Sequence, residues 1–97
     1  MLRELFEIIL NRKSNPTPDS YTVQLLSDGE DRILQKVGEE AVEVILASKC
    51  QGDRRLIEEM ADLFYHSLVL LAYHDLKFSD IEDELRRRHQ QFPTSSS

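Results

Sequence analysis

Residues 60–73, MADLFYHSLVLLAY, are apolar on nearly every side of a helix, and this segment most constrains how the chain can fold. Helical spacing of apolar residues extends around it, which predicts a helix from about residue 53 to residue 74. A helix that is apolar all round is normally buried. A chain of 97 residues has too small a core to surround one easily. We therefore expect a partner chain to cover part of it.

The N-terminal half predicts three further helices. Apolar residues recur at helical spacing over residues 2–13, and the turn-forming stretch KSNPTPDS then interrupts them. Ser20 is the expected cap of a short helical segment that carries YTVQLL. Asp28 is the expected cap of a helix over residues 30–48, which Gly52 terminates.

The C-terminal half adds one helix. Ser79 and Glu82 are spaced as a capping box, and Ile81 and Leu85 are expected to face inward. The sequence thus predicts an all-α fold, a helical bundle of four to five helices completed by a partner chain.

Composition supports one soluble domain. The chain is 40% hydrophobic and 31% charged with three glycines, which is typical of a compact helical protein. We expect residues 1–92 to form a single domain and residues 93–97 to be a disordered tail.

The net charge of -6 argues against binding to nucleic acid or to anionic membranes. The longest apolar run, SLVLLAY, is too short to span a bilayer, and the N-terminal stretch lacks the features of a signal peptide. The lone Cys50 cannot form an internal disulfide, which suits a reducing compartment. A cytoplasmic location is expected.

Three acids crowd one side of the helix predicted over residues 30–48. Glu39, Glu40 and Glu43 lie within about a third of its circumference, although like charges at this spacing repel by about 0.2–0.5 kcal/mol per pair. Lys36 falls between them and can pair with Glu39 and Glu40, or it can contact a phosphate. The core stripe is expected on the opposite side, at Leu34, Val37, Ala41 and Ile45.

The next helix repeats the pattern inside apolar sequence. Glu59 and Asp62 lie one turn apart, and a carboxylate among such neighbours needs a partner. The intervening loop is short, so the two helices are expected to be antiparallel and their acids to converge. Converging carboxylates suit Mg²⁺, which shares its coordination shell with substrate phosphates. We therefore expect phosphate-ester or pyrophosphate chemistry, with Glu39 orienting or deprotonating the attacking water.

Two other groups have plainer interpretations. His66 is expected to be structural, and Arg86, Arg87 and Arg88 are expected to form a solvated helix end, the alternatives being contacts to substrate.

These motifs resemble a known family. E-x-x-E on one helix and E-x-x-D on the next is the pattern of the all-α nucleoside triphosphate pyrophosphohydrolase superfamily, which includes MazG-like enzymes. KVGEEAVEVILASK followed by EEMADLFYHSLVLL closely resembles the phosphoribosyl-ATP pyrophosphatase family over about residues 2–90, together with SYTVQLL before these stretches and ELRRRH after them. The resemblance implies Mg²⁺-dependent hydrolysis of phosphoribosyl-ATP to phosphoribosyl-AMP and pyrophosphate, the second step of histidine biosynthesis, by a homodimer.

The same resemblance implies roles for individual residues. The metal ligands would be Glu40, Glu43, Glu59 and Asp62. Glu39 would be the base or would support the ligands, and Lys36 would contact a phosphate. The candidates on the substrate side are Ser20, Tyr21 and Thr22.

Two alternatives stay open at this point. A house-cleaning pyrophosphohydrolase acting on free or damaged nucleoside triphosphates would use the same metal ligands. A non-catalytic helical module would use the acidic face to dock a basic partner, with binding that weakens steeply with salt.

Overall fold

The structure is a computed structural model that describes residues 1–91. It contains five α-helices and, within those residues, no strand, which confirms the all-α prediction. The predicted domain end at residue 92 and the predicted tail 93–97 lie outside the described residues. The helices are α1 Leu2–Ser14, α2 Tyr21–Asp28, α3 Glu30–Leu46, α4 Asp53–Tyr73 and α5 Phe78–Gln91.

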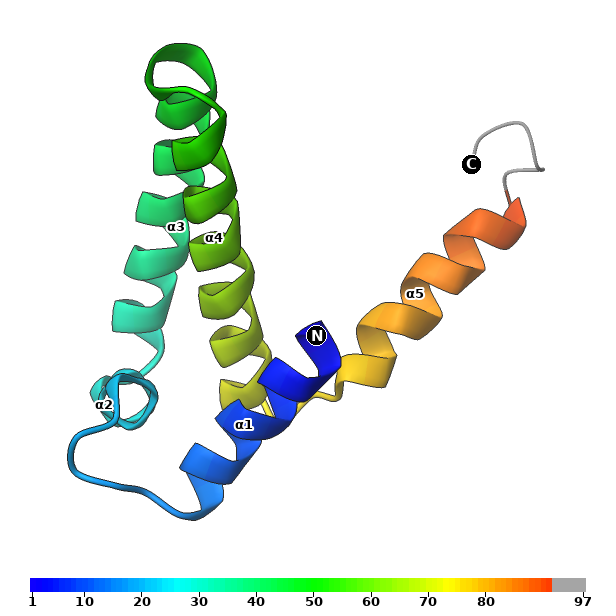
Figure 1. The fold of residues 1–97 in the computed structure, drawn as a ribbon. Helices are drawn as coiled ribbons and strands as arrows, with labels where there is room; N and C mark the ends of the chain where they lie inside the picture. Colours follow the sequence, from blue (N-terminus) through cyan, green and yellow to red (C-terminus); the bar gives the residue numbers. More distant parts are fainter. Residues whose placement is uncertain (92–97) are drawn as a thin grey trace.

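Helices α3 and α4 lie side by side as an antiparallel hairpin (Figure 1). Helices α1 and α2 pack across the open end of this hairpin, and α5 projects away from it. The core lies where α1 and α2 meet α3 and α4, at the end of the hairpin remote from its turn. Its buried residues are Phe6, Ile9, Leu25, Ile33, Leu68, Val69, Leu71 and Ala72. No helix of the described part is long and apolar enough to cross a bilayer.

Ser20 caps α2 as predicted, since its side chain accepts a hydrogen bond from the Val23 amide at 3.2 Å. The predicted cap at Asp28 is wrong, because Asp28 is the last residue of α2. Gly29 alone joins α2 to α3, with φ of 97°. A one-residue connection needs this left-handed conformation, and glycine adopts it without strain.

The turn between α3 and α4 was predicted correctly at Gly52, whose φ is 89°. The helix before it ends at Leu46 and continues as a single π-helical turn over Ala47–Gln51. Gly52 then reverses the chain, and α4 returns antiparallel to α3. This reversal is what allows acids on two successive helices to face each other.

The predicted core stripe of α3 is wrong for the single chain. Leu34 and Ile45 are 45% and 62% exposed, and Val37 and Ala41 are half-buried. Buried positions along α3 and into the π-helical turn that follows it instead recur every seven residues, at about two turns of a helix. These positions are Ile33, Glu40 and Ala47. An apolar stripe shows that something covers it, but it does not show whether the cover belongs to the same chain.

Helix α5 also departs from prediction. Ile81 and Leu85 are exposed rather than inward-facing. Ser79 lies inside the helix, and the first turn is held instead by Asp80, whose side chain accepts from the Lys77 amide at 2.9 Å. Glu82 is turned to an ion pair with Arg3 on α1.

Candidate metal and phosphate site

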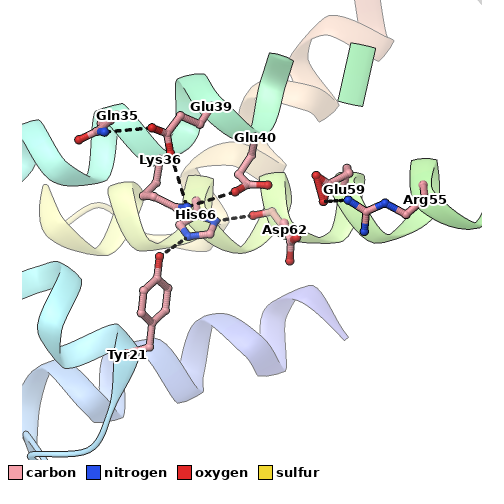
Figure 2. Close-up of polar contacts among 9 residues, drawn as sticks. All are labelled: Tyr21, Gln35, Lys36, Glu39, Glu40, Arg55, Glu59, Asp62 and His66. Carbon is pink, nitrogen blue, oxygen red and sulfur yellow. Dashed lines mark hydrogen bonds and ion pairs between the residues drawn. The ribbon is translucent and has the colours of Figure 1, made fainter. Parts of the chain in front are cut away.

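Three of the predicted acids converge between α3 and α4. Glu40 from α3 and Glu59 and Asp62 from α4 each offer a carboxylate oxygen, and these oxygens lie within 4.8 Å of one another. Figure 2 shows the side chains meeting in the space between the two helices. Glu40 and Glu59 are buried, whereas Asp62 is exposed. The cluster therefore has a buried floor and one side open to solvent.

Electrostatics make this cluster unfavourable without a cation. Burial raises the pKa of Glu59, and the charges of Glu40, Asp62 and Glu43 raise it further, against the opposing effect of Arg55. A divalent cation would reverse this balance. The donor atoms are all carboxylate oxygens, which suit a hard ion such as Mg²⁺ better than zinc, whose sites typically include Cys or His ligands. The residues present therefore fit a Mg²⁺ ion.

Glu43 lies at the margin of the cluster. It is half-buried and one turn beyond Glu40, and it is close enough to Glu59 to raise the pKa of that residue. Its carboxylate is not part of the three-oxygen group. The structure thus brings three of the four predicted ligands together and places the fourth beside them.

Lys36 lies at one end of the cluster. Its ammonium is 3.4 Å from a Glu40 oxygen and 3.6 Å from a Glu39 oxygen, as the helical spacing predicted. Partial burial lowers the pKa of Lys36, but Tyr21, Glu40 and Glu39 outweigh burial and raise the pKa above its ordinary value. The lysine is therefore charged and faces the carboxylates.

Arg55 lies at the other end, and the sequence reasoning missed it. One guanidinium nitrogen is 2.8 Å from Glu58 and another is 3.5 Å from Glu59. The signal was present, because Arg55 precedes Glu59 by four residues and therefore shares its side of α4. Two cations thus bracket the carboxylates along the hairpin, one on each helix (Figure 2).

Glu39 is turned away from the cluster. It is exposed, and its carboxylate accepts a hydrogen bond from Gln35 at 2.9 Å. That hydrogen bond, aided by Lys36, outweighs desolvation and lowers the pKa of Glu39. The carboxylate is therefore ionised at neutral pH and is linked to the cluster through Lys36.

The three substrate-side candidates have different surroundings. Ser20 is taken up by capping α2. Thr22 is buried, and its hydroxyl hydrogen-bonds to that of Tyr65 on α4. Tyr21 is 44% exposed, and its hydroxyl lies 3.0 Å from His66 Nε2. Of the three, Tyr21 is the one whose side chain reaches His66, which bonds in turn to the backbone carbonyl of Asp62 (Figure 2).

The arginines of α5 behave as a solvated helix end, as predicted. Arg86 pairs with Asp83, and both Arg87 and Arg88 pair with Glu84. Hydrogen bonds from those two arginines lower the pKa of Glu84 to about 2.

Known proteins resemble the chain over most of its length. The phosphoribosyl-ATP pyrophosphohydrolase family model matches residues 2–89. A phosphoribosyl-ATP pyrophosphatase of Geotalea daltonii is 50% identical over 88 residues, which cover 91% of this chain and 83% of the relative. A relative of the same name from Pelotomaculum thermopropionicum is 50% identical over 90 residues, which cover 93% of this chain and 92% of the relative. The chain therefore belongs to the phosphoribosyl-ATP pyrophosphohydrolase family, a family of hydrolases.

Proposed function

We propose that this enzyme hydrolyses phosphoribosyl-ATP to phosphoribosyl-AMP and pyrophosphate with the help of Mg²⁺, as the second step of histidine biosynthesis. One observation carries the proposal: in a chain of this family, Glu40, Glu59 and Asp62 converge from two antiparallel helices with their oxygens within 4.8 Å. The exposed thiol of Cys50 favours a reducing compartment, so we place the enzyme in the cytoplasm.

In this proposal the metal is held by Glu40, Glu59 and Asp62, with Glu43 as a further ligand at the margin. When bound, Mg²⁺ neutralises charge on the phosphates and lowers the pKa of a coordinated water. The floor formed by Glu40 and Glu59 supplies two buried carboxylates. Exposed Asp62 leaves the solvent side open for the phosphates.

The remaining charged groups act on the substrate. Lys36 and Arg55 lie at opposite ends of the carboxylates, where each can take a phosphate oxygen. A chain of phosphates lying along the hairpin would meet a cation at either end. Glu39 is ionised and pairs with Lys36, and we assign it the role of accepting the proton of an attacking water, which requires its carboxylate to leave Gln35 and turn toward the cluster.

The dimer is part of the same proposal. Helix α4 exposes Ile57, Met60 and Phe64 along one stripe, and α3 exposes Leu34, Val42 and Ile45. Such a large exposed apolar surface is typical of an interaction site. On α4 this stripe lies nearly opposite Asp62, because Phe64 and Asp62 are two residues, or about 200°, apart.

Further features favour a second copy as the cover. A methyl group added at Gly38, on the exposed side of α3, would meet nothing within 4 Å, so this glycine leaves room for a close approach from outside. An apolar groove of about 260 Å³ continues the α4 stripe toward α5. Its lining includes Phe64, Leu68, Leu71, Ile81 and Leu85. The proposed dimer would cover apolar residues that the sequence predicts to face inward.

A substrate panel tests the activity. We expect rapid pyrophosphate release from phosphoribosyl-ATP with Mg²⁺, little from ATP or dCTP, and none from any of them in EDTA. Faster release from ATP or dCTP would retain the metal site and favour the house-cleaning alternative. Folded protein that releases pyrophosphate from none of the three would contradict hydrolysis, and salt-sensitive binding to a basic protein would then support the docking module.

A charge placed in the apolar stripe tests the dimer. Phe64→Glu is expected to halve the mass measured by light scattering after size-exclusion chromatography, because a carboxylate cannot be buried unpaired in an apolar interface. Ile8→Glu is the matched control, since Ile8 is 50% exposed on α1, away from the stripe. A wild-type monomer, or a Phe64→Glu dimer, would show that the stripe is not the interface.

A further inference from the structure

Each buried carboxylate of the cluster has a cation one turn earlier in its own helix. On α3 the Lys36 ammonium lies 3.4 Å from a Glu40 oxygen. On α4 a guanidinium nitrogen of Arg55 lies 3.5 Å from a Glu59 oxygen, at the other end of the cluster (Figure 2). The two acidic side chains are only 10% and 7% exposed. A buried carboxylate is costly unless a cation compensates it, so these two pairs balance the charge of the metal-free site.

The two contacts of Arg55 differ in kind. Its Nη1 donates a hydrogen bond to Glu58 at 2.8 Å. Its Nη2 lies 3.5 Å from Glu59, which is beyond ordinary hydrogen-bond distance, so this contact is one of charge alone. The Arg55 side chain is 49% exposed, so a ligand can reach it from solvent. Arg55 can therefore leave Glu59 while it stays bonded to Glu58.

Glu59 is also one of the three acids whose oxygens lie within 4.8 Å of one another. A cation held by these oxygens would share Glu59 with Arg55, and two cations beside one carboxylate repel each other. The repulsion is relieved when Arg55 turns toward another anion. A phosphate on the open side of the cluster, beside exposed Asp62, is such an anion, and the planar guanidinium matches its oxygens.

We propose that Arg55 is the resident counter-ion of Glu59 in the metal-free enzyme and passes to a substrate phosphate as the site fills, while Glu58 is the positioning residue that tethers it. This inference rests on the proposed function, in which Arg55 contacts a phosphate. Arg55 then opposes the binding of a divalent cation until a phosphate draws it away. The metal and the substrate therefore favour each other's binding, and by the same factor.

Arg55→Met is expected to act in opposite directions on the two ligands. Without the competing cation, the free enzyme should bind Mg²⁺ roughly five- to tenfold more tightly, measured from the Mg²⁺ dependence of its melting temperature. The same variant should have a KM for phosphoribosyl-ATP roughly tenfold higher with little change in kcat, because one charge-assisted contact to the substrate is lost. A merely structural role for Arg55 would not strengthen one ligand and weaken the other.

Arg54→Met is the matched control. It removes the same charge from the neighbouring residue, which also pairs with Glu58, at 3.1 Å, but within the described residues does not pair with Glu59. Its Mg²⁺ affinity and its KM should stay within about twofold of wild type, since an exposed ion pair contributes little. Equal tightening of Mg²⁺ binding in Arg54→Met and Arg55→Met would overturn the proposal, because the net charge alone would then explain it.

Glu58→Gln tests the tether. Glutamine keeps an acceptor oxygen but loses the charge, so Arg55 should pair more closely with Glu59. Mg²⁺ binding should weaken by about two- to fivefold and the KM for phosphoribosyl-ATP should rise. In an Arg55→Met background the same substitution should change neither. Equal effects in both backgrounds would show that Glu58 acts through its own charge and would overturn its positioning role.

The outcomes separate this inference from the proposed function. Folded wild type that neither binds Mg²⁺ nor hydrolyses phosphoribosyl-ATP would overturn the proposed function, and the inference with it. Active wild type whose Mg²⁺ affinity does not rise in Arg55→Met would overturn the counter-ion role alone. Tighter Mg²⁺ binding together with a higher KM, in Arg55→Met and not in Arg54→Met, would support it.

Discussion

Asp62→Asn is expected to lower kcat for phosphoribosyl-ATP by roughly 10²–10³-fold or more while leaving the fold intact. Asp62 is the exposed member of the three-carboxylate cluster, so its charge contributes to the site and its side chain contributes little to the core. Asparagine keeps the shape and one oxygen but loses the negative charge that a metal needs. Steady-state kinetics with a circular dichroism melt would separate the two effects.

Asp53→Asn is the control for this variant. It makes the same substitution in the same helix, at an exposed position in the first turn of α4. The loss there is limited to a weak interaction with the helix dipole, worth about 0.3–1 kcal/mol, and activity should be retained. Full activity in Asp62→Asn would remove Asp62 from the site and leave Glu40 and Glu59 without the solvent-side ligand.

Local patterns predicted the helices and most of their ends. The cap at Ser20 and the turn at Gly52 follow from residue types that act on their own backbone, so the sequence carries them directly. The cap at Asp28 failed for a related reason. Aspartate and glycine both occur at the N-cap of a helix. Asp28 would cap α3 only if two residues joined α2 to α3, but Gly29 alone joins them and is itself the cap.

The errors in burial came from a different cause. The stripe of Leu34 and Ile45 and the pair Ile81 and Leu85 are apolar in the sequence, yet they are exposed in the single chain. Periodicity identifies a face that avoids water, and it cannot identify what covers that face. Glu40 shows the converse, since a charged residue occupies the buried position between Ile33 and Ala47.

The candidate site was predictable in its anionic half. Two acids one turn apart on each of two antiparallel helices can converge where the helices face each other, and Glu40, Glu59 and Asp62 do converge, while Glu43 lies at the margin. The polar contacts of Tyr21 with His66 were not predictable, because they join residues 45 positions apart in the sequence. Such a contact depends on where α2 packs, which no local pattern reports.

Glu59→Gln is expected to raise the melting temperature of the metal-free protein and to weaken its stabilisation by Mg²⁺. Burial and neighbouring carboxylates raise the pKa of Glu59 above 4.5 in the folded state. Between the ordinary pKa of Glu59 in the unfolded state and its raised pKa in the folded state, the folded state binds more protons than the unfolded state. Folding stability therefore falls as pH rises through that window. Above the raised pKa of Glu59, the full loss of folding stability is present. Glutamine cannot ionise and so avoids this loss. The variant should therefore be stabilised most at neutral pH and little below pH 4.

Magnesium should reverse the order of stability. A ligand that binds only the folded state stabilises it by about 2.7 kcal/mol at a hundred times its Kd, and the wild type should show such a shift at millimolar Mg²⁺. Glu59→Gln should show a much smaller one, since a buried ligand oxygen has lost its charge. Glu84→Gln is the matched control, because Glu84 has a lowered pKa, lies on α5 and takes no part in the cluster. It should reduce stability slightly at neutral pH and leave the Mg²⁺ shift unchanged. Equal Mg²⁺ shifts in wild type and Glu59→Gln, measured by calorimetry across pH 4–8, would show that the ion binds elsewhere.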